Sequence, residues 1–567
     1  MSHFFCSKDC PDLCGMEMAT DAAPFKVAAG QPQDWCAPGF VCGKFNTFIR
    51  REIDNGLLSW QRTPGGRVDY ADAPAALDAL ASWLAPLRDK KILYLRGSGS
   101  LGYNMGYWDQ LFSQFPGAVS ISGDPCDATG SAAHYEDFRS VSNPPVTALA
   151  QAQTIILYGK NAAVTSPHLA VYLQQLRRNG TEIILIDPVR TATARLADHY
   201  IQIQPASDGL VACALLTRLG YEKDHSVSSL LTAAGISDAD FALLLDRIAR
   251  RKVAHIQGLG MQRHENGMNA IRWINRLAVR TGAQDLLYYG HGSKRFWYGH
   301  PAWFDQQLPI DEVPQRLAQG EFDLFVNIAA NPAVTYPDSN RWARGLAKTT
   351  TLVVDTNDSA TTGYADFFLK VGGMFAQTDF MGSYFFPHRQ RRQALTRELS
   401  DMAAAQGIAE RLGISLQIRD EAELSAPPQS PRRYQTEHLE LMMPTAARPF
   451  RLLTASHPAY LNSQTLPGQE TGRQVVLIHP DDAEKRQIGA GDRVRIVGDC
   501  GHFTALAQVT DRVGAGVLMS WKNLPMPEGL CNSAISSRLT DSRQGLAYYA
   551  APVDIVKSDG HHHAHLG

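Results

Sequence analysis

The stretch TIILYGKNAAVTSPHLAVYLQQLRRNGTEIILID, residues 154–187, decides the fold class of this chain of 567 residues. It begins and ends with short apolar runs at 154–159 and 182–187, and a helical pattern lies between them over 169–178. A strand, a helix and a strand at this spacing predict parallel pairing with a right-handed crossover. The stretch therefore predicts an α/β fold with doubly wound parallel sheets.

Similar strands, each followed by a polar loop, occur on both sides of this stretch. KILYL (91–95) runs into GSGSLG (97–102), and DLFVN (323–327) and TLVVD (351–355) end in the same way. Beyond a polar, proline-containing segment, short segments such as VVLIHP (475–480) alternate with glycine and aspartate turns. This change of texture predicts a β-barrel-like domain at the C-terminal end.

The charge balance excludes one broad class of partner. The 54 Lys and Arg residues face 56 Asp and Glu residues, a net charge of −2, whereas a nucleic-acid groove usually appears as a basic excess. We therefore expect no nucleic-acid partner. No apolar run reaches the roughly 18 residues that span a bilayer. The first ten residues, MSHFFCSKDC, lack the pattern of an export signal. We expect a cytoplasmic protein with no membrane segment of its own.

Cysteines are concentrated at the front of the chain. Cys6, Cys10 and Cys14 are separated by three residues each, and Cys42 follows. Four thiolates suit a tetrahedral zinc ion or a [4Fe–4S] cluster. Three close ligands and one distant ligand favour the cluster, because zinc ribbons usually pair their cysteines in two CxxC knuckles; structural thiols are the remaining alternative. Cys36 is interpreted as a bystander.

These patterns divide the chain into several parts, as its length also suggests at roughly 150 residues per domain. The predicted parts are a [4Fe–4S] domain at 1–60, an α/β domain at 61–140 plus 331–425, a second α/β domain at 141–330, a linker at 426–445, a β-barrel-like domain at 446–557 and a histidine-rich tail at 558–567.

The motifs CSKDCPDLCG (6–15) and VCGKF (41–45) resemble those of the molybdenum and tungsten bis(molybdopterin guanine dinucleotide) oxidoreductases, the dimethyl sulfoxide reductase family. The resemblance implies a catalytic subunit with an N-terminal [4Fe–4S] domain and a Mo or W ion held by two pterin guanine dinucleotides. It continues in the expected order through YGKNAAVTSPH (158–168), LIDPVRTATARLADHYIQIQPASDG (185–209), QGLGMQRHENG (257–267), NIAANPAVTYPD (327–338), VVDTNDSATTGYADFFL (353–369) and NSAISSRLTDSRQG (532–545).

Residues at strand ends are the candidates for binding these dinucleotides. Glycine and asparagine let backbone N–H groups approach phosphates, and aspartate accepts hydrogen bonds from ribose or guanine. Ordinary turns are the alternative. The candidates are Gly97, Gly99, Gly159, Asn161, Asp187, Thr191, Asp208, Gly258, Gly260, Asn331 and Asp355, with Asn462, Asn532 and Arg538 in the C-terminal domain.

The glycines of GSGSLG (97–102) also match the fingerprint of NAD-binding strands. The acidic residue expected about 20 residues further on is not clear, so we favour contact with the pterin cofactor.

The resemblance also implies a side-chain ligand for the metal. Cys126, in SGDPCDATG (122–130), lies where the family usually supplies it, and a thiolate suits high-valent Mo or W. The alternatives are a buried thiol, ligation by Asp124 or Asp127, or no protein ligand. Lys44 matches the family's basic residue between cluster and pterin, although a surface lysine would look the same.

Proton handling is assigned to His134, with His168 and His264 as further candidates, although a lone histidine is more often structural. Formate and formylmethanofuran dehydrogenases carry a histidine directly after the ligand, where this chain has Asp127, which argues against a formate substrate. The chain is also short for the family.

The expected activity is two-electron oxidation or reduction of a small molecule, by oxygen-atom or hydride transfer, with electrons passing through the cluster. A ferredoxin-like or flavin-bearing subunit is the expected electron-transfer partner. A non-redox hydratase or transhydroxylase, a non-catalytic electron-transfer subunit and a zinc-organised NAD dehydrogenase are the alternatives.

Overall fold

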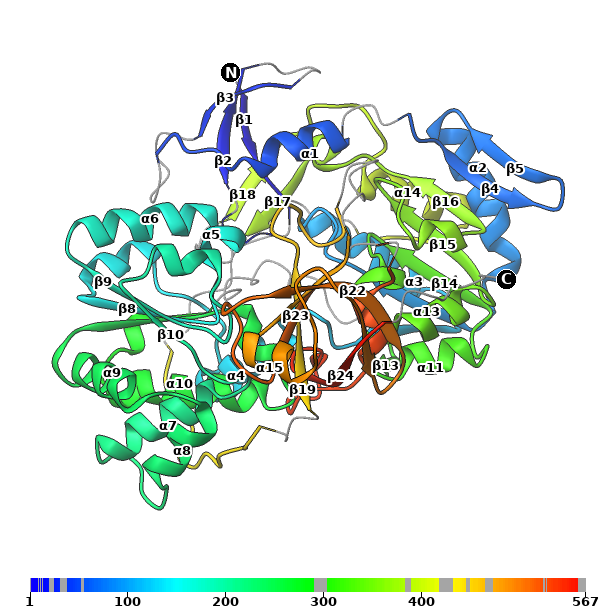
Figure 1. Cartoon of the computed structure of the whole chain (residues 1–567). Coiled ribbons are helices and arrows are strands. Elements are labelled where there is room, and N and C mark those ends of the chain that lie inside the picture. The colour runs from blue at the N-terminus through cyan, green and yellow to red at the C-terminus, as the bar shows by residue number, and fades with distance from the viewer. Residues whose placement is uncertain are drawn as a thin grey trace.

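The computed structural model describes residues 2–8, 10, 12, 14–19, 25–30, 38–52, 56–289, 303–382, 389–417, 432–444, 449–464, 473–523, 526 and 528–558. They form four units (Figure 1). A small β unit lies at the top, a smaller α/β unit at the left, a larger one at the right, and a barrel in front between the two.

The N-terminal unit is an antiparallel sheet with one helix. Its strands are β1 (Ser2–Phe5), β2 (Gly15–Met18) and β3 (Val27–Gly30), and α1 (Lys44–Glu52) follows. Phe4 and Phe25 stack on Phe375 of the larger α/β unit, with ring centroids 4.9 and 4.4 Å apart. Aromatic packing therefore fixes this small unit on its larger neighbour.

The larger α/β unit contains an eight-stranded sheet in the order β13-β7-β6-β14-β15-β16-β4-β5. Successive side chains of a strand point to opposite faces. Ile92 and Tyr94 pack under α2, α3 and α14, whereas Leu93 and Leu95 pack under α11, α13 and the barrel. The strands are β4 (Ser59–Thr63), β5 (Gly66–Tyr70), β6 (Ile92–Arg96), β7 (Ala118–Ser122), β13 (Gln307–Pro309), β14 (Leu324–Ile328), β15 (Thr350–Asp355) and β16 (Phe367–Lys370), and the helices are α2 (Ala73–Leu84), α3 (Gly106–Ser113), α11 (Val313–Ala318), α12 (Pro332–Thr335), α13 (Ser339–Leu346) and α14 (Asp401–Arg411).

The smaller α/β unit has a parallel five-stranded sheet in the order β10-β9-β8-β11-β12. Helix α6 covers one face through Leu169 and Leu173, and α7 and α10 cover the other. The strands are β8 (Thr154–Tyr158), β9 (Glu182–Ile186), β10 (His199–Ile201), β11 (Val253–Gln257) and β12 (Leu287–Tyr289), and the helices are α4 (Ala128–Phe138), α5 (Ala162–Thr165), α6 (Pro167–Arg178), α7 (Asp208–Arg218), α8 (Val227–Ala234), α9 (Asp238–Arg250) and α10 (Gly267–Arg280).

The C-terminal unit is a closed barrel in the order β19-β23-β20-β22-β21-β24. Its elements are β19 (Phe450–Ser456), β20 (Val475–Ile478), α15 (Pro480–Lys485), β21 (Arg493–Gly498), β22 (His502–Val509), β23 (Val517–Lys522) and β24 (Ala551–Lys557). The predicted fold class, parallel α/β sheets followed by a β-barrel, is confirmed. A separate hairpin, β17 (Asp379–Gly382) and β18 (Arg389–Arg392), lies beside β1.

Three parts of the chain join neighbours other than those the predicted ranges assign. Strands β13 and β14 fall in the range 141–330 but pair with β7 and β6 of the larger sheet. Helix α4 falls in 61–140 but packs on α10 of the smaller unit. Residues 432–444 of the expected linker lie along α10, where Arg272 and Asn269 bond to Thr436 and Glu440. Local patterns identify such elements without showing which sheet they will join.

Membrane-spanning potential is low across the described helices. No single one of them is long and apolar enough to cross a bilayer, although α8 and α9 pass the length and composition test as a pair bent by 113°.

A carboxylate from the C-terminal unit accepts hydrogen bonds at the start of α10. Asp541 accepts hydrogen bonds from the backbone N–H groups of Met268 and Asn269, at 2.8 and 2.7 Å. We expect Asp541→Ala to lower the free energy of unfolding by about 1–2 kcal/mol, because two N–H groups at a helix start lose their acceptor. Urea unfolding would measure this. The matched change at exposed Asp511 should have little effect, and equal losses in both variants would contradict the assignment.

Candidate functional site

Two cavities meet inside the molecule. The β8 cavity is lined by loops at the carboxyl ends of strands in the smaller sheet, and the β6 cavity by loops at the carboxyl ends of strands in the larger sheet. Carboxyl ends of parallel strands are the usual ligand sites of open α/β sheets. Lys8, Cys126, Arg263 and Asn462 line both cavities, so the cavities adjoin at these four side chains.

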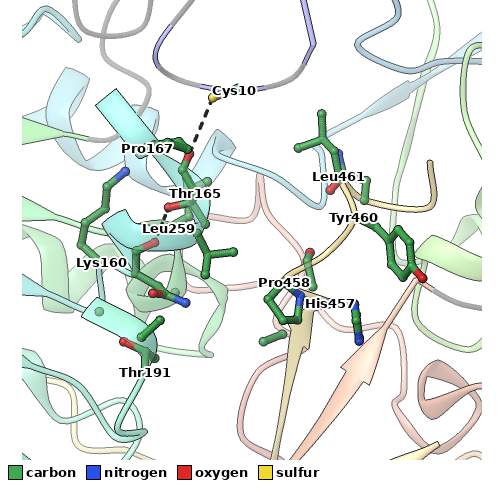
Figure 2. Close-up of a pocket in the computed structure, with 18 of the residues that line it drawn as sticks. Cys10, Lys160, Thr165, Pro167, Thr191, Leu259, His457, Pro458, Tyr460 and Leu461 are labelled. Carbon is green, nitrogen blue, oxygen red and sulfur yellow. Dashed lines mark hydrogen bonds between the residues drawn. The ribbon is translucent and has the colours of Figure 1, made fainter. Parts of the chain in front are cut away.

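The β8 cavity runs between the smaller sheet and the barrel. Figure 2 shows Lys160, Thr165 and Thr191 on one wall and His457 and Tyr460 on the opposite wall, with Cys10 above them. The candidates from the sequence that line this cavity are Lys44, Gly159, Asn161, Asp187, Thr191, Asp208, Gly260, His264 and Asn462, together with Cys126 and the four N-terminal cysteines.

Two buried carboxyl groups line the β8 cavity. Asp187 follows β9 and Asp208 begins α7. Burial raises the pKa of each carboxyl group to about 7, and the charge of Asp208 adds to the rise at Asp187. Asp187 accepts a hydrogen bond from the Val189 N–H, at 2.9 Å. Such carboxyl groups would accept hydrogen bonds from the N–H groups of a guanine or from ribose hydroxyls.

The β6 cavity has the more polar lining. Of the candidates from the sequence, Gly97, Gly99, Asn331, Asp355 and Asn462 line it, with Cys126. At Gly97 the chain passes so close to Ala329 that an added Cβ would lie 2.1 Å from its carbonyl oxygen. Only glycine fits there, so this predicted phosphate-binding turn also has a packing role.

The four N-terminal cysteines line one end of the β8 cavity. All four are reduced thiols that line it, and Cys6, Cys10 and Cys14 each come under the electrostatic influence of Cys42. Burial raises the pKa of every one, that of Cys6 to about 11. Buried thiols that must ionise together need a bound cation, and this donor set suits an iron–sulfur cluster or zinc.

The cysteine unit contacts α5, the short helix that follows β8. The Cys10 thiol donates to the Thr165 carbonyl oxygen at 3.7 Å, and the Lys44 ammonium donates to the Val164 carbonyl oxygen at 3.0 Å. Lys44 is thus half-buried and lines the cavity together with Cys42, and it is not a solvated surface lysine.

A second donor set overlaps the first. Ligand atoms of Asp12, Cys14 and His168 lie within 4.8 Å of one another, and His168 Nδ1 lies 3.3 Å from the Cys14 sulfur. These three side chains could also bind zinc, so a zinc site stays the alternative to an iron–sulfur cluster in the N-terminal unit.

Cys126 lies where the two cavities join. It follows β7 and precedes α4, and its backbone N–H donates to the Asp124 carboxylate at 2.7 Å. Arg263 and Lys522 are close enough for their charges to interact with this thiol. The Cys126 sulfur therefore lies near two basic side chains.

Some buried polar atoms that face the β8 cavity have no hydrogen-bond partner among the described residues. They are Thr191 Oγ1, Asp208 Oδ1, Arg263 Nε and His264 Nδ1, and Ser100 Oγ is in the same condition at the β6 cavity. Buried polar groups normally have partners. These atoms therefore fit a polar ligand in the two cavities, as a pterin dinucleotide would be.

Six candidates from the sequence lie outside the linings of both cavities: His134, Gly258, Asn532 and Arg538, together with His168 and Asp127. His134 is buried and bonds to Gln257 at 2.8 Å, and burial lowers its pKa to about 3. Gly258 packs on Gly159, where a Cβ would lie 2.1 Å from the carbonyl oxygen. Asn532 donates to the Val334 carbonyl oxygen, and Arg538 pairs with Asp499. In the structure these residues make packing and hydrogen-bond contacts within the protein, away from the linings of the two cavities.

Several lining residues were not singled out from the sequence. They are Lys8, Lys160, Arg263, Arg512, Trp521, Lys522, Tyr548 and Tyr549. Arg263 lies within the segment QGLGMQRHENG, whose resemblance to the family could have identified it as a site residue. Lys522 and Tyr548 come from the C-terminal unit, where no local sequence pattern marks them.

Comparisons with known proteins agree with this geometry. Residues 104–369 match the family model "Molybdopterin oxidoreductase", and residues 450–552 match "Molydopterin dinucleotide binding domain". The chain is 24% identical to "Probable oxidoreductase YyaE" of Bacillus subtilis (strain 168), over 68% of this chain and 64% of that protein. It is 24% identical to "Probable oxidoreductase YoaE" of the same organism, over 97% of this chain and 98% of that protein.

A solved structure has the same fold. Acetylene hydratase from Pelobacter acetylenicus matches with a TM-score of 0.77 at 12% identity, over 98% of this chain and 100% of that one. Fold and family models together define the class, a molybdopterin-type enzyme with a dinucleotide-binding barrel domain. The chain belongs to the molybdopterin oxidoreductase family, which confirms the resemblance to the dimethyl sulfoxide reductase family.

In protein prepared without cofactor, the buried carboxyl groups should make the free energy of unfolding depend on pH. Because the pKa of Asp208 rises from 3.8 to about 7, the folded state keeps a proton that the unfolded chain releases, so stability falls as pH rises through this range. We expect Asp208→Asn to be stabilising by about 1–3 kcal/mol more at pH 8 than at pH 5. Urea unfolding at both pH values would measure this, and Asp238→Asn on the exposed start of α9 is the control. An equal effect at both pH values would contradict the assignment.

Proposed function

We propose that this protein is the catalytic subunit of a molybdenum or tungsten oxidoreductase that holds two molybdopterin guanine dinucleotides and one [4Fe–4S] cluster. The observation that carries the proposal is the meeting of two cavities at Cys126. Each cavity starts at the carboxyl end of its own parallel sheet, which suits one dinucleotide in each. The dinucleotide-binding match of the barrel supports the same interpretation.

The residues present fit the dinucleotides. In the β8 cavity, Asp187 and Asp208 would accept from a guanine, and Thr191 has a hydroxyl group that faces the same space. In the β6 cavity, Gly97, Gly99 and Asn331 would present backbone groups to phosphates, and Asp355 would accept from a ribose. Asn462 lines both cavities and would contact both molecules.

Cys6, Cys10, Cys14 and Cys42 would hold the cluster, and Cys126 would be the protein ligand of the metal. When bound, Mo or W supplies two-electron redox chemistry at a small substrate, and the cluster accepts or gives electrons singly. Lys44, which lines the β8 cavity together with Cys42, would hold positive charge beside the path that electrons take. Asp124 orients the Cys126 loop by accepting its N–H.

A partner that carries electrons follows from this scheme. A single cluster near the N-terminal unit would exchange electrons with a ferredoxin-like or flavin-bearing subunit, while the substrate would be a small molecule. Non-redox hydration is the second candidate, because the fold matches that of an acetylene hydratase. At 12% identity this match concerns the fold alone. The two candidates differ in whether turnover needs an electron acceptor.

Metal and nucleotide analysis tests the proposal. Protein purified without oxygen should contain about four Fe and one Mo or W per chain, and acid hydrolysis should release about two guanine nucleotides. Cys10→Ala should lower the iron content, because the cluster loses a ligand, whereas Cys500→Ala, far from this set, should not. Protein with zinc in place of iron, and without pterin, would contradict the proposal.

The role of Cys126 has a separate test. In Cys126→Ala, X-ray absorption at the Mo or W edge should show one sulfur ligand fewer, because the thiolate is lost from the metal. Iron content should stay the same, since the cluster ligands are intact. Cys531→Ala is the control, because its thiol bonds to the Trp521 carbonyl oxygen at 3.2 Å. An unchanged sulfur count would assign the ligand elsewhere.

A further inference from the structure

His168 and Cys14 make a side-chain contact between the smaller α/β unit and the N-terminal unit. The Nδ1 atom of His168 lies 3.3 Å from the Cys14 sulfur, although 154 positions separate the two residues in the chain. His168 is 2% exposed and is the second residue of α6, whereas Cys14 comes directly before β2. The contact therefore forms because the two units pack together.

Two neighbours hold His168 in this position. Its backbone N–H donates to an Asp12 carboxylate oxygen at 2.9 Å, which ties the first turn of α6 to the cysteine segment. Phe40 packs edge-on against the imidazole, with ring centroids 4.8 Å apart. Because the side chain is buried between these neighbours, the fold determines the direction in which Nδ1 points.

Asp12 also offers Nδ1 a second acceptor. Its Oδ2 atom lies 3.5 Å from Nδ1, further away than the Cys14 sulfur. The same oxygen already accepts the His168 backbone N–H, and the charge of Asp12 also acts on the buried ammonium of Lys160. The sulfur is thus the nearer of the two acceptors for Nδ1.

The iron ligation that we assign to Cys14 determines which atom donates. A sulfur bound to iron carries no hydrogen, so a hydrogen bond between these two atoms has Nδ1 as its donor. Reduction adds one negative charge to a cluster, and an N–H group that points at a ligand sulfur stabilises the more negative state. Such hydrogen bonds therefore raise the reduction potential.

We propose that His168 donates a hydrogen bond from Nδ1 to the Cys14 sulfur and thereby raises the reduction potential of the [4Fe–4S] cluster. This inference rests on the proposed function, which supplies the cluster. His168 is then a positioning residue that acts through a cluster ligand, in place of the proton handling expected from the sequence.

Midpoint potentials of the cluster test the inference. Intact protein purified without oxygen would be titrated at one pH with titanium(III) citrate, which supplies the electron, and the reduced cluster would be followed by electron paramagnetic resonance. The variants are His168→Leu, which has no donor, and His168→Asn, whose amide N–H takes the place of Nδ1. His438→Leu, at an exposed position of the segment 432–444, is the control. Iron content would be determined for each protein.

We expect all four proteins to contain the same amount of iron. In His168→Leu, the equilibrium constant for one-electron reduction should fall about tenfold, as for a lost hydrogen bond to a charged group, which is a fall of about 59 mV in the midpoint potential. His168→Asn should recover most of this difference, and His438→Leu should have the wild-type potential.

Three results would overturn the inference: equal potentials in the wild type and His168→Leu, the same fall in His168→Asn as in His168→Leu, or loss of iron from both variants, which would make the imidazole a metal ligand. If His168→Leu alone loses iron, a wild-type potential in His168→Asn supports the inference and a lower one overturns it. Wild-type protein without iron would instead overturn the proposed function itself.

Discussion

The two cavities begin at the carboxyl ends of parallel strands in the two sheets, and they adjoin at the loop that carries Cys126. The position of this loop determines how the two halves of the site are arranged. Cys126 lies on it, with the β8 cavity on one side and the β6 cavity on the other. The C-terminal unit contacts both α/β units: Tyr548 donates to the Pro125 carbonyl oxygen, Asp541 accepts from the first turn of α10 in the smaller unit, and Asn532 donates to the Val334 carbonyl oxygen in the larger one.

The strands and many of the cavity residues could be predicted from the sequence, because buried parallel strands have a recognisable local pattern. Apolar runs such as TIILY mark buried strands, and the residues directly after them must lie at the carboxyl edge of a sheet. Gly159, Asp187, Gly97 and Asp355 were identified in this way, and all four line a cavity. Their roles in binding stay predictions, whereas the fold class and the family are established.

The remainder depends on contacts between distant segments. His134 looks chemically competent in the sequence, yet α4 turns it into the core against Tyr289, with ring centres 4.7 Å apart. Strand β14 resembles its neighbours in sequence, but its sheet is decided by pairing with β6. Lys522 stands out only once the barrel closes and brings it to Arg263, because nothing around it in the sequence signals a buried charge.

A structure of the protein purified without oxygen, with anomalous scattering recorded at the Fe and the Mo or W edges, would show whether Cys126 holds the metal. We expect one heavy-metal peak at bonding distance from the Cys126 sulfur, iron peaks among Cys6, Cys10, Cys14 and Cys42, and a guanine dinucleotide in each cavity. A heavy-metal peak away from Cys126, or a nucleotide in one cavity alone, would contradict this expectation.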